Sequence, residues 1–161
     1  AAFEAVRVQD VPSHYRALLA HDEHMTVTVE RYHQCLVNVQ VLRQRREDPF
    51  YSREILLRRS TDNVVVQYGI VRLFLPSLKP AVRDEILSGQ IPLGRALIQH
   101  NVLRHVRLGE LWHVHSNRRL AQLFGCESIS TYGRTALIYF NDQPALELLE
   151  IVAPIEESPL S

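Results

Sequence analysis

Hydrophobic and polar residues alternate along much of this chain, and the alternation predicts strands. In residues 35–41 the apolar positions are Cys35, Val37, Val39 and Val41, and residues 25–30 (Met-Thr-Val-Thr-Val-Glu) show the same period of two. A strand with one apolar and one polar face is typical of an antiparallel sheet. The same reasoning predicts strands over residues 50–60, 63–75, 102–115, 132–140 and 145–153.

Short helices are predicted between these strands, over residues 12–19, 80–87, 92–98 and 118–124. The second begins at Pro80 and is followed by Gly89, in line with the preference for proline at a helix start and glycine after its end. Turn-forming residues at 61–63 and 141–144 predict two hairpins. The pattern as a whole predicts an α+β fold, in which one large antiparallel sheet is backed by short helices.

Composition narrows the class of protein. The chain has 161 residues and 18.6 kDa, with 46% hydrophobic and 22% charged residues, which predicts one globular domain over residues 1–161 with a frayed polar tail from about residue 156. Eighteen basic residues balance eighteen acidic ones, which disfavours a nucleic-acid partner. No apolar run is long enough to predict a membrane helix. Two cysteines do not form a disulfide framework, which fits reduced thiols and a cytoplasmic location.

Two charged residues fall on faces that the alternation predicts to be buried. Arg53 shares its parity with Ile55 and Leu57, and Glu150 shares its parity with Leu148 and Val152. Because a lone buried charge costs several kcal/mol, each needs a partner or a ligand. Either the two side chains pair with each other, or a bulge turns one outward, or Arg53 binds a ligand carboxylate in a closed pocket while Glu150 contacts a hydroxyl.

Other candidate residues are less specific. Arg72 and Arg134 also lie among apolar residues of their own parity, which makes each a second candidate for an anion contact or a rim position. His113 and His115 share a strand face without a third ligand nearby in the sequence, and the cluster at residues 21–24 resembles a polar turn, so no metal site is expected. The chain also contains no nucleophile elbow and no glycine-rich phosphate loop.

Several short motifs resemble the chorismate pyruvate-lyase family. Ser52-Arg53-Glu54-Ile55-Leu56-Leu57 resembles that family's strand with the substrate-carboxylate arginine, and Ile91-Pro92-Leu93-Gly94-Arg95 resembles its Pro-Leu-Gly signature at a helix start. Gln143-Pro144, followed by a strand with Glu150 and then Pro154, matches the hairpin that precedes the family's glutamate. The segment His24-Met25-Thr26 and the spacing from Arg72 to Pro76 are also similar.

The resemblance implies a six-stranded antiparallel sheet with helical flaps around a buried ligand pocket, and no metal or organic cofactor. It implies an enzyme that splits chorismate into 4-hydroxybenzoate and pyruvate, in quinone or other aromatic-metabolite synthesis. Arg53 would hold the ring carboxylate, Glu150 would contact the C4 hydroxyl, and the backbone amides of Met25 and Leu93 would orient the ligand. The expected partners are therefore small molecules, with no nucleic acid and no membrane, and the expected state is a monomer or weak homo-oligomer.

Two departures from the family's pattern keep alternatives open. The last hairpin holds one residue more than in typical members, so Glu147 rivals Glu150 for the glutamate role, and residues 118–130 form a longer stretch than in compact members. A divergent lyase acting on another enolpyruvyl or cyclic carboxylate is one alternative. The other is a non-catalytic ligand-binding domain similar to the UTRA effector domains of bacterial transcription regulators, whose fold looks alike. Those domains normally follow a DNA-binding segment, and the short stretch before Met25 favours the lyase over the regulator.

Overall fold

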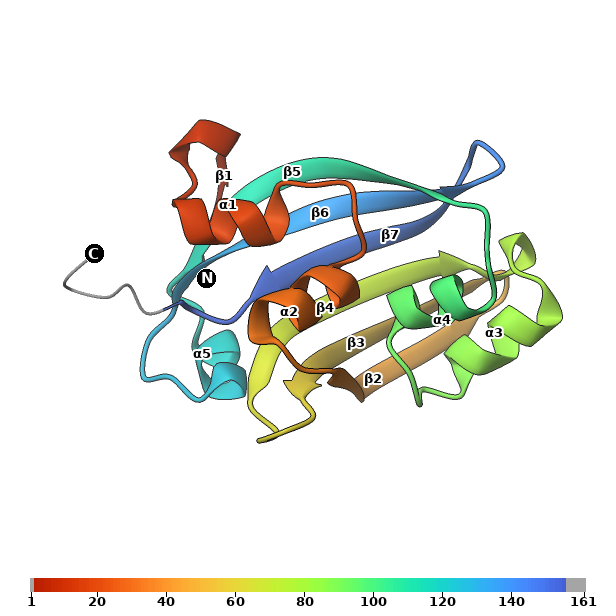
Figure 1. Ribbon diagram of the computed structural model, residues 1–161, viewed down its shortest axis with the longest axis horizontal. Helices are drawn as coiled ribbons and strands as arrows, with labels where there is room; N and C mark the ends of the chain where they lie inside the picture. Colours follow the sequence, from red (N-terminus) through yellow and green to blue (C-terminus); the bar gives the residue numbers. More distant parts are fainter. Residues whose placement is uncertain (1, 156–161) are drawn as a thin grey trace.

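Seven antiparallel strands form one sheet in the order β1-β5-β6-β7-β4-β3-β2 (Figure 1). The computed structural model describes residues 2–155, so the tail expected from about residue 156 lies outside the described residues. The strands are β1 (Ala2–Val6), β2 (Val37–Glu47), β3 (Phe50–Arg59), β4 (Val65–Phe74), β5 (His105–His115), β6 (Ser130–Phe140) and β7 (Gln143–Val152). The α+β class and the single antiparallel sheet are confirmed. The expected number of strands is one too low, because β1 has no clear alternation and forms a strand only by pairing with β5 at the sheet edge.

Four short helices cover one face of the sheet, and a fifth packs against the other face (Figure 1). The covering helices are α1 (Ser13–Leu19), α2 (Met25–His33), α3 (Pro80–Leu87) and α4 (Leu93–Gln99), and the fifth is α5 (Arg118–Phe124). Single 3-10 turns occur at Val8–Asp10 and Leu75–Ser77. None of the helices within residues 2–155 is long and apolar enough to cross a membrane.

The strand predicted over residues 25–30 is wrong, because this segment forms the first two turns of α2. Met25 and Val29 lie four residues apart, so they share one face of the helix, and both are buried against Leu18 and Ile55 in the core between α1, α2 and the sheet. This packing outweighs the weak strand preference of alternating Thr and Val residues. The other predicted strands and helices are present, with ends shifted by a few residues.

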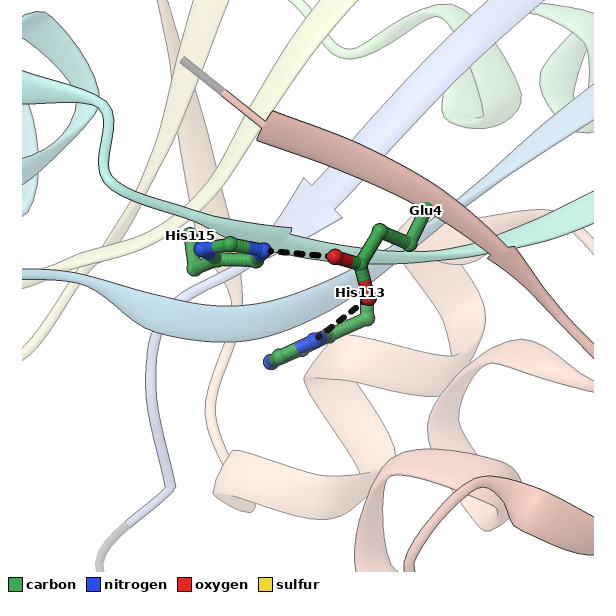
Figure 2. Close-up of side chains that lie close together, drawn as sticks. All are labelled: Glu4, His113 and His115. Atoms are coloured by element: carbon green, nitrogen blue, oxygen red, sulfur yellow. Dashed lines mark hydrogen bonds and ion pairs between the residues drawn. The ribbon is translucent and has the colours of Figure 1, made fainter.

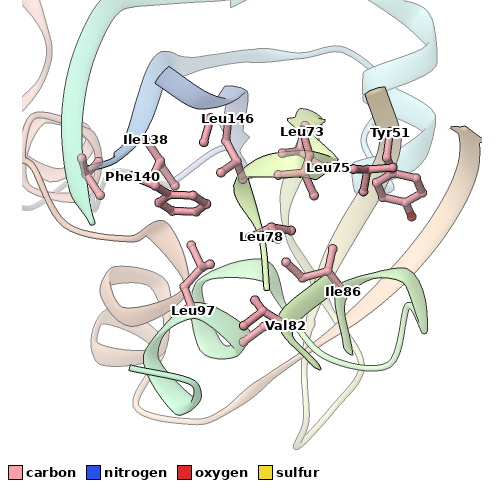
Figure 3. Close-up of a cluster of buried hydrophobic side chains, with 14 residues drawn as sticks. Tyr51, Leu73, Leu75, Leu78, Val82, Ile86, Leu97, Ile138, Phe140 and Leu146 are labelled. Carbon is pink, nitrogen blue, oxygen red and sulfur yellow. The ribbon is translucent and has the colours of Figure 1, made fainter. Parts of the chain in front are cut away.

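The largest apolar cluster lies between α3, α4 and the sheet (Figure 3). It contains Leu73 and Leu146 from neighbouring strands, Val82 and Ile86 from α3, and Leu97 from α4. A second cluster joins α1 and α2 to the same face of the sheet. Between these two clusters, the starts of α2 and α4 lie over the centre of the sheet. They therefore lie above the buried residues of β3, β4 and β7.

The fifth helix is held to the opposite face by an apolar and an ionic contact. Leu120 and Ala121 pack against Leu56, whose side chain points away from the four covering helices. Arg119 forms a two-point ion pair with Glu54, with N–O distances of 2.5 and 2.7 Å. The hydrogen bonds from Arg119 lower the pKa of the Glu54 carboxyl to about 2.

Candidate functional site

A small cavity lies between the sheet and the starts of α2 and α4, with a volume of about 50 Å³. Its walls include five of the six residues predicted as site residues: Met25, Arg53, Leu93, Arg134 and Glu150. The strands supply Arg53, Arg134 and Glu150, and the helix starts supply Met25 and Leu93. The rest of the wall is mostly apolar. Residues from distant parts of the sequence therefore converge on one enclosed space, as the resemblance implies.

Arg53 is a buried cation without an anionic partner. Its side chain is only 2% exposed, and its guanidinium donates from Nη1 to the carbonyl of Ile86 at 3.2 Å. Its Nε has no hydrogen-bond partner, and no carboxylate of residues 2–155 forms an ion pair with it. Burial lowers the pKa of the Arg53 guanidinium, because desolvation disfavours the charged form. A buried guanidinium with donor capacity to spare is suited to bind an anion.

Glu150 has a protein partner, but that partner is not Arg53. Arg134 donates from Nε to Oε1 of Glu150 at 3.0 Å, and Gln67 donates to Oε2 at 3.4 Å. In the sheet Arg53 lies opposite Val71, whereas Glu150 lies opposite Gly69, so the two charges are offset along the strands. The possibility that Arg53 and Glu150 simply neutralise each other is therefore wrong.

Arg134 is fully buried and uses its donors on the protein itself. Besides Glu150, it donates to the carbonyl oxygens of Leu19, His21 and Glu23 at 3.3, 2.9 and 2.9 Å. These carbonyls belong to the last residue of α1 and to the segment that joins α1 to α2, so Arg134 ties this part of the chain to the sheet and orients Glu150 at the same time. The guanidinium of Arg134 is thus engaged by the protein, and its role as an anion contact stays a prediction.

The close packing of α4 against α2 explains why the Pro-Leu-Gly segment has a glycine at position 94. A Cβ at position 94 would lie 3.0 Å from both the Cβ of His24 and the Oγ1 of Thr26. A glycine here lets α4 approach the start of α2 closely, which closes one side of the cavity. Next to it, Arg95 forms an ion pair with Glu30 of α2 and donates to the carbonyl of Val37 at 3.3 Å.

The sequence reasoning missed two polar residues of the cavity, Gln67 and His24. Gln67 lies on the same side of β4 as Val71 and Leu73, so its parity could have identified it as a polar residue on the buried face. Its Oε1 has no hydrogen-bond partner among residues 2–155, which leaves an unpaired acceptor on a residue that lines the cavity. His24 accepts a hydrogen bond at Nε2 from Arg104 at 2.5 Å.

The stability of the protein is expected to fall as the pH drops from 6.5 towards 4, through His24. Burial, with smaller contributions from Arg104 and Arg134, lowers the pKa of His24 from 6.5 to about 4. The unfolded chain therefore binds a proton that the folded protein does not, and this costs about 2–3 kcal/mol of unfolding free energy over that interval. Urea unfolding at pH 7 and 4.5 measures this loss.

The matched variant His24→Gln should show a smaller loss over the same pH interval. His21 and His33 also have lowered pKa values because of burial, but both remain in the variant and cancel in the comparison. The carboxyl of Glu54 titrates below the interval, since its pKa is about 2. An equal loss in His24→Gln and in the wild type would contradict the assignment to His24.

The structure does not bring Arg72 or Glu147 to the cavity. The two side chains are half-exposed or more, and they face each other across β4 and β7 at 3.8 Å on the other face of the sheet. Arg72 also lies over the ring of Phe50, 4.0 Å from its centre. Both parities of β4 are rich in apolar residues, so alternation alone could not assign Arg72 to a face. Glu147 is thus separated from the cavity, while Glu150 lines it.

Comparisons with known proteins identify the fold. No family model and no curated protein matches the sequence. Among solved structures, the effector domain of PhnF from Mycobacterium smegmatis matches with a TM-score of 0.59 and 12% identity, covering 84% of this chain and 96% of that one. The ligand-binding domain of a protein from Bordetella bronchiseptica described as a GntR-family transcriptional regulator matches with a TM-score of 0.52 and 14% identity, covering 76% and 91%.

A longer structure of PhnF is matched over only part of its length. It matches with a TM-score of 0.58 and 12% identity over 80% of this chain, which spans only 62% of the length of that protein. At these identities the comparison shows the fold alone. The chain therefore shares the fold of these domains, which is the fold expected both for the lyase and for its UTRA-like alternative.

The expectation of a chorismate-cleaving enzyme is corrected by these comparisons. The matching structures described above are an effector domain and the ligand-binding domain of a protein described as a GntR-family transcriptional regulator. The motifs that suggested the lyase have a structural explanation: Gly94 permits close helix packing, and Arg134 holds Glu150 as a fixed hydrogen-bond acceptor. These two features indicate a shared fold and a polar cavity. Neither feature is evidence that the protein cleaves a bond.

Proposed function

We propose that this chain is a non-catalytic ligand-binding domain that takes a small organic anion into the cavity between α2, α4 and the sheet. The observation that carries the proposal is Arg53, a buried guanidinium that lines the cavity without an anionic partner. A ligand carboxylate would supply the missing negative charge and accept hydrogen bonds from the guanidinium. The fold of regulator effector domains supports binding as the role.

The other polar groups of the cavity define the rest of the ligand. The carboxylate of Glu150 accepts hydrogen bonds, and Gln67 offers an acceptor oxygen that has no partner within the described part of the chain. Both groups favour a ligand with a donor such as a hydroxyl. At about 50 Å³ the cavity accommodates only a few non-hydrogen atoms, since an engineered cavity that binds benzene measures about 150 Å³. A small hydroxy-carboxylate fits this description, and a ring-containing one requires the starts of α2 and α4 to move apart.

Calorimetric titration with acid and amide pairs tests the proposal. Lactate and lactamide form the small pair, and 4-hydroxybenzoate and 4-hydroxybenzamide form the larger one. We expect at least one acid to bind, with its neutral amide at least about 10-fold weaker because the charge-assisted contact is lost. Binding of lactate but not of 4-hydroxybenzoate would indicate a rigid cavity. Binding of 4-hydroxybenzoate would indicate that the cavity opens. Equal binding of acid and amide, or binding of neither acid, would contradict the proposal.

A further inference from the structure

A second cluster of polar side chains lies outside the cavity, where the edge strand β1 meets β5 (Figure 2). Glu4 pairs with His113 in the strand register, and His115 lies on the same side of β5 two residues on. The Nε2 of His115 is 3.2 Å from one carboxylate oxygen of Glu4, and the Nδ1 of His113 is 3.9 Å from the other. One ligand atom from each residue can be chosen so that all three lie within 4.8 Å of one another.

The remaining nitrogens of both imidazoles have partners of their own. The Nε2 of His113 lies 3.0 Å from the Oγ of Ser130, and the Nδ1 of His115 lies 3.2 Å from the Oγ of Ser116. The ring of Tyr132 lies beside His113, with 4.9 Å between ring centres. Histidines that bind metals usually hydrogen-bond through their second nitrogen in this way, which fixes the ring and the nitrogen presented to the metal.

Hydrogen bonding within the cluster does not account for its geometry. The 3.9 Å separation between His113 and Glu4 exceeds the length of a hydrogen bond, although both groups face each other. In a tetrahedral zinc site with bonds of about 2.0–2.1 Å, neighbouring ligand atoms lie roughly 3.3 Å apart. The separations of 3.2 and 3.9 Å run to the two different carboxylate oxygens of Glu4, and one ligand atom from each residue lies within 4.8 Å of the others. Side-chain adjustment would bring these atoms closer, so that one ion contacts all three residues.

We propose that Glu4, His113 and His115 form a binding site for a divalent transition metal ion, with Zn²⁺ as the best match. Two imidazoles and one carboxylate suit zinc, nickel or copper, whereas magnesium and calcium prefer oxygen ligands. The side chains of the two histidines are 26% and 31% exposed, so a fourth position is open to water or another ligand. The ion would join β1 to β5 and thereby fix the edge of the sheet.

This site was not predictable from local sequence. His113 and His115 were recognised as a pair, but their third ligand comes from a position 111 residues before His115. It became visible only through the pairing of β1 with β5, and β1 itself was not predicted. The site is independent of the ligand-binding proposal, because none of its three residues lines the cavity.

Zinc binding by the untagged full chain tests the proposal. We expect equilibrium dialysis against ZnCl₂ to show one equivalent bound, and Glu4→Gln, His113→Asn and His115→Asn each to weaken binding at least about 10-fold. His14→Asn is the matched control, because His14 is an exposed histidine outside the cluster and its loss should leave the affinity unchanged. MgCl₂ should not compete.

Thermal melts provide a second readout that does not depend on dialysis. ZnCl₂ should raise the melting temperature of the wild type and of His14→Asn, but not that of Glu4→Gln, since an ion stabilises only the state that binds it. Unchanged zinc affinity in all three cluster variants, or loss of binding in His14→Asn, would overturn the site. The melting temperatures without zinc show whether each variant is folded, and either outcome leaves the acid and amide titrations unaffected.

Discussion

Replacement of Arg134 by Met is expected to lower the free energy of unfolding by about 3–5 kcal/mol, the largest effect of any single change considered for this protein. The side chain is fully buried and holds Glu150 at 3.0 Å. Without it, Glu150 becomes a buried carboxylate with only the 3.4 Å contact from Gln67. The carbonyls of His21 and Glu23 also lose the donor that ties the α1–α2 segment to the sheet. Urea unfolding at pH 7 measures the change.

A double variant separates the ion pair from the other contacts of Arg134. In Arg134→Met/Glu150→Gln the buried carboxylate is neutralised, so part of the loss should be recovered, with a coupling energy of about 1.5–3 kcal/mol. Arg107→Met is the control, because Arg107 is an exposed arginine on the neighbouring strand β5, and it should change stability by less than about 0.5 kcal/mol. Strictly additive effects of the two single changes would show that Arg134 and Glu150 do not stabilise each other.

Replacement of Arg53 by Met is expected to have opposite effects on stability and on binding. In the ligand-free protein it removes a buried charge without an anionic partner, so we expect stability to rise by about 1–2 kcal/mol. The carbonyl of Ile86, which Arg53 contacts, keeps a hydrogen bond from the backbone N–H of Gly89, so this acceptor is not left unpaired. Binding of the preferred acid should weaken by roughly 100-fold, which corresponds to about 3 kcal/mol.

Arg72→Met is the matched control for this experiment. Arg72 lies on the next strand but on the opposite face of the sheet, half-exposed and paired with Glu147. The Arg72→Met variant should bind the acid with unchanged affinity, and its free energy of unfolding should differ from that of the wild type by less than about 1 kcal/mol. Destabilisation of Arg53→Met by more than about 1 kcal/mol would show that Arg53 supports the fold, and unchanged affinity would remove it from the binding site.

These two arginines illustrate how one cavity combines structural and binding roles. Arg134 has five polar contacts to the protein, whereas Arg53 donates to Ile86 and retains a free Nε. Stability and ligand binding are therefore expected to respond to different residues of the same wall. Binding sites commonly retain such destabilising groups, because a side chain poised for a ligand lacks a partner in the ligand's absence.

The lyase expectation shows the limit of motif reasoning in this chain. Arg53, Gly94 and Glu150 all line one cavity, but their presence there does not distinguish an enzyme from a binding domain. Gly94 is required by the approach of α4 to His24 and Thr26, which is a demand of the fold. A fold shared by enzymes and binding domains carries its packing residues into both, so these residues cannot report the chemistry.

Local patterns of this sequence were sufficient for most of the elements and for the burial of the key charges. Period-two alternation located six of the seven strands, and parity alone placed Arg53 and Glu150 on the buried face. Alternation succeeds there because each strand has to bury one face against the helices, whatever its neighbours are. It failed at Met25–His33, where a helical face of Met25 and Val29 fits the core equally well.

The tertiary structure decided which charges meet. Strand register offset Arg53 from Glu150, gave Glu150 to Arg134, and turned Arg72 and Glu147 to the other face. It also brought Glu4 to His113 and His115 across more than one hundred residues. Pairing between distant strands depends on the arrangement of the whole sheet, which no local window of sequence contains. The sequence by itself therefore determined the elements and their buried charges, and the sheet order determined their partners.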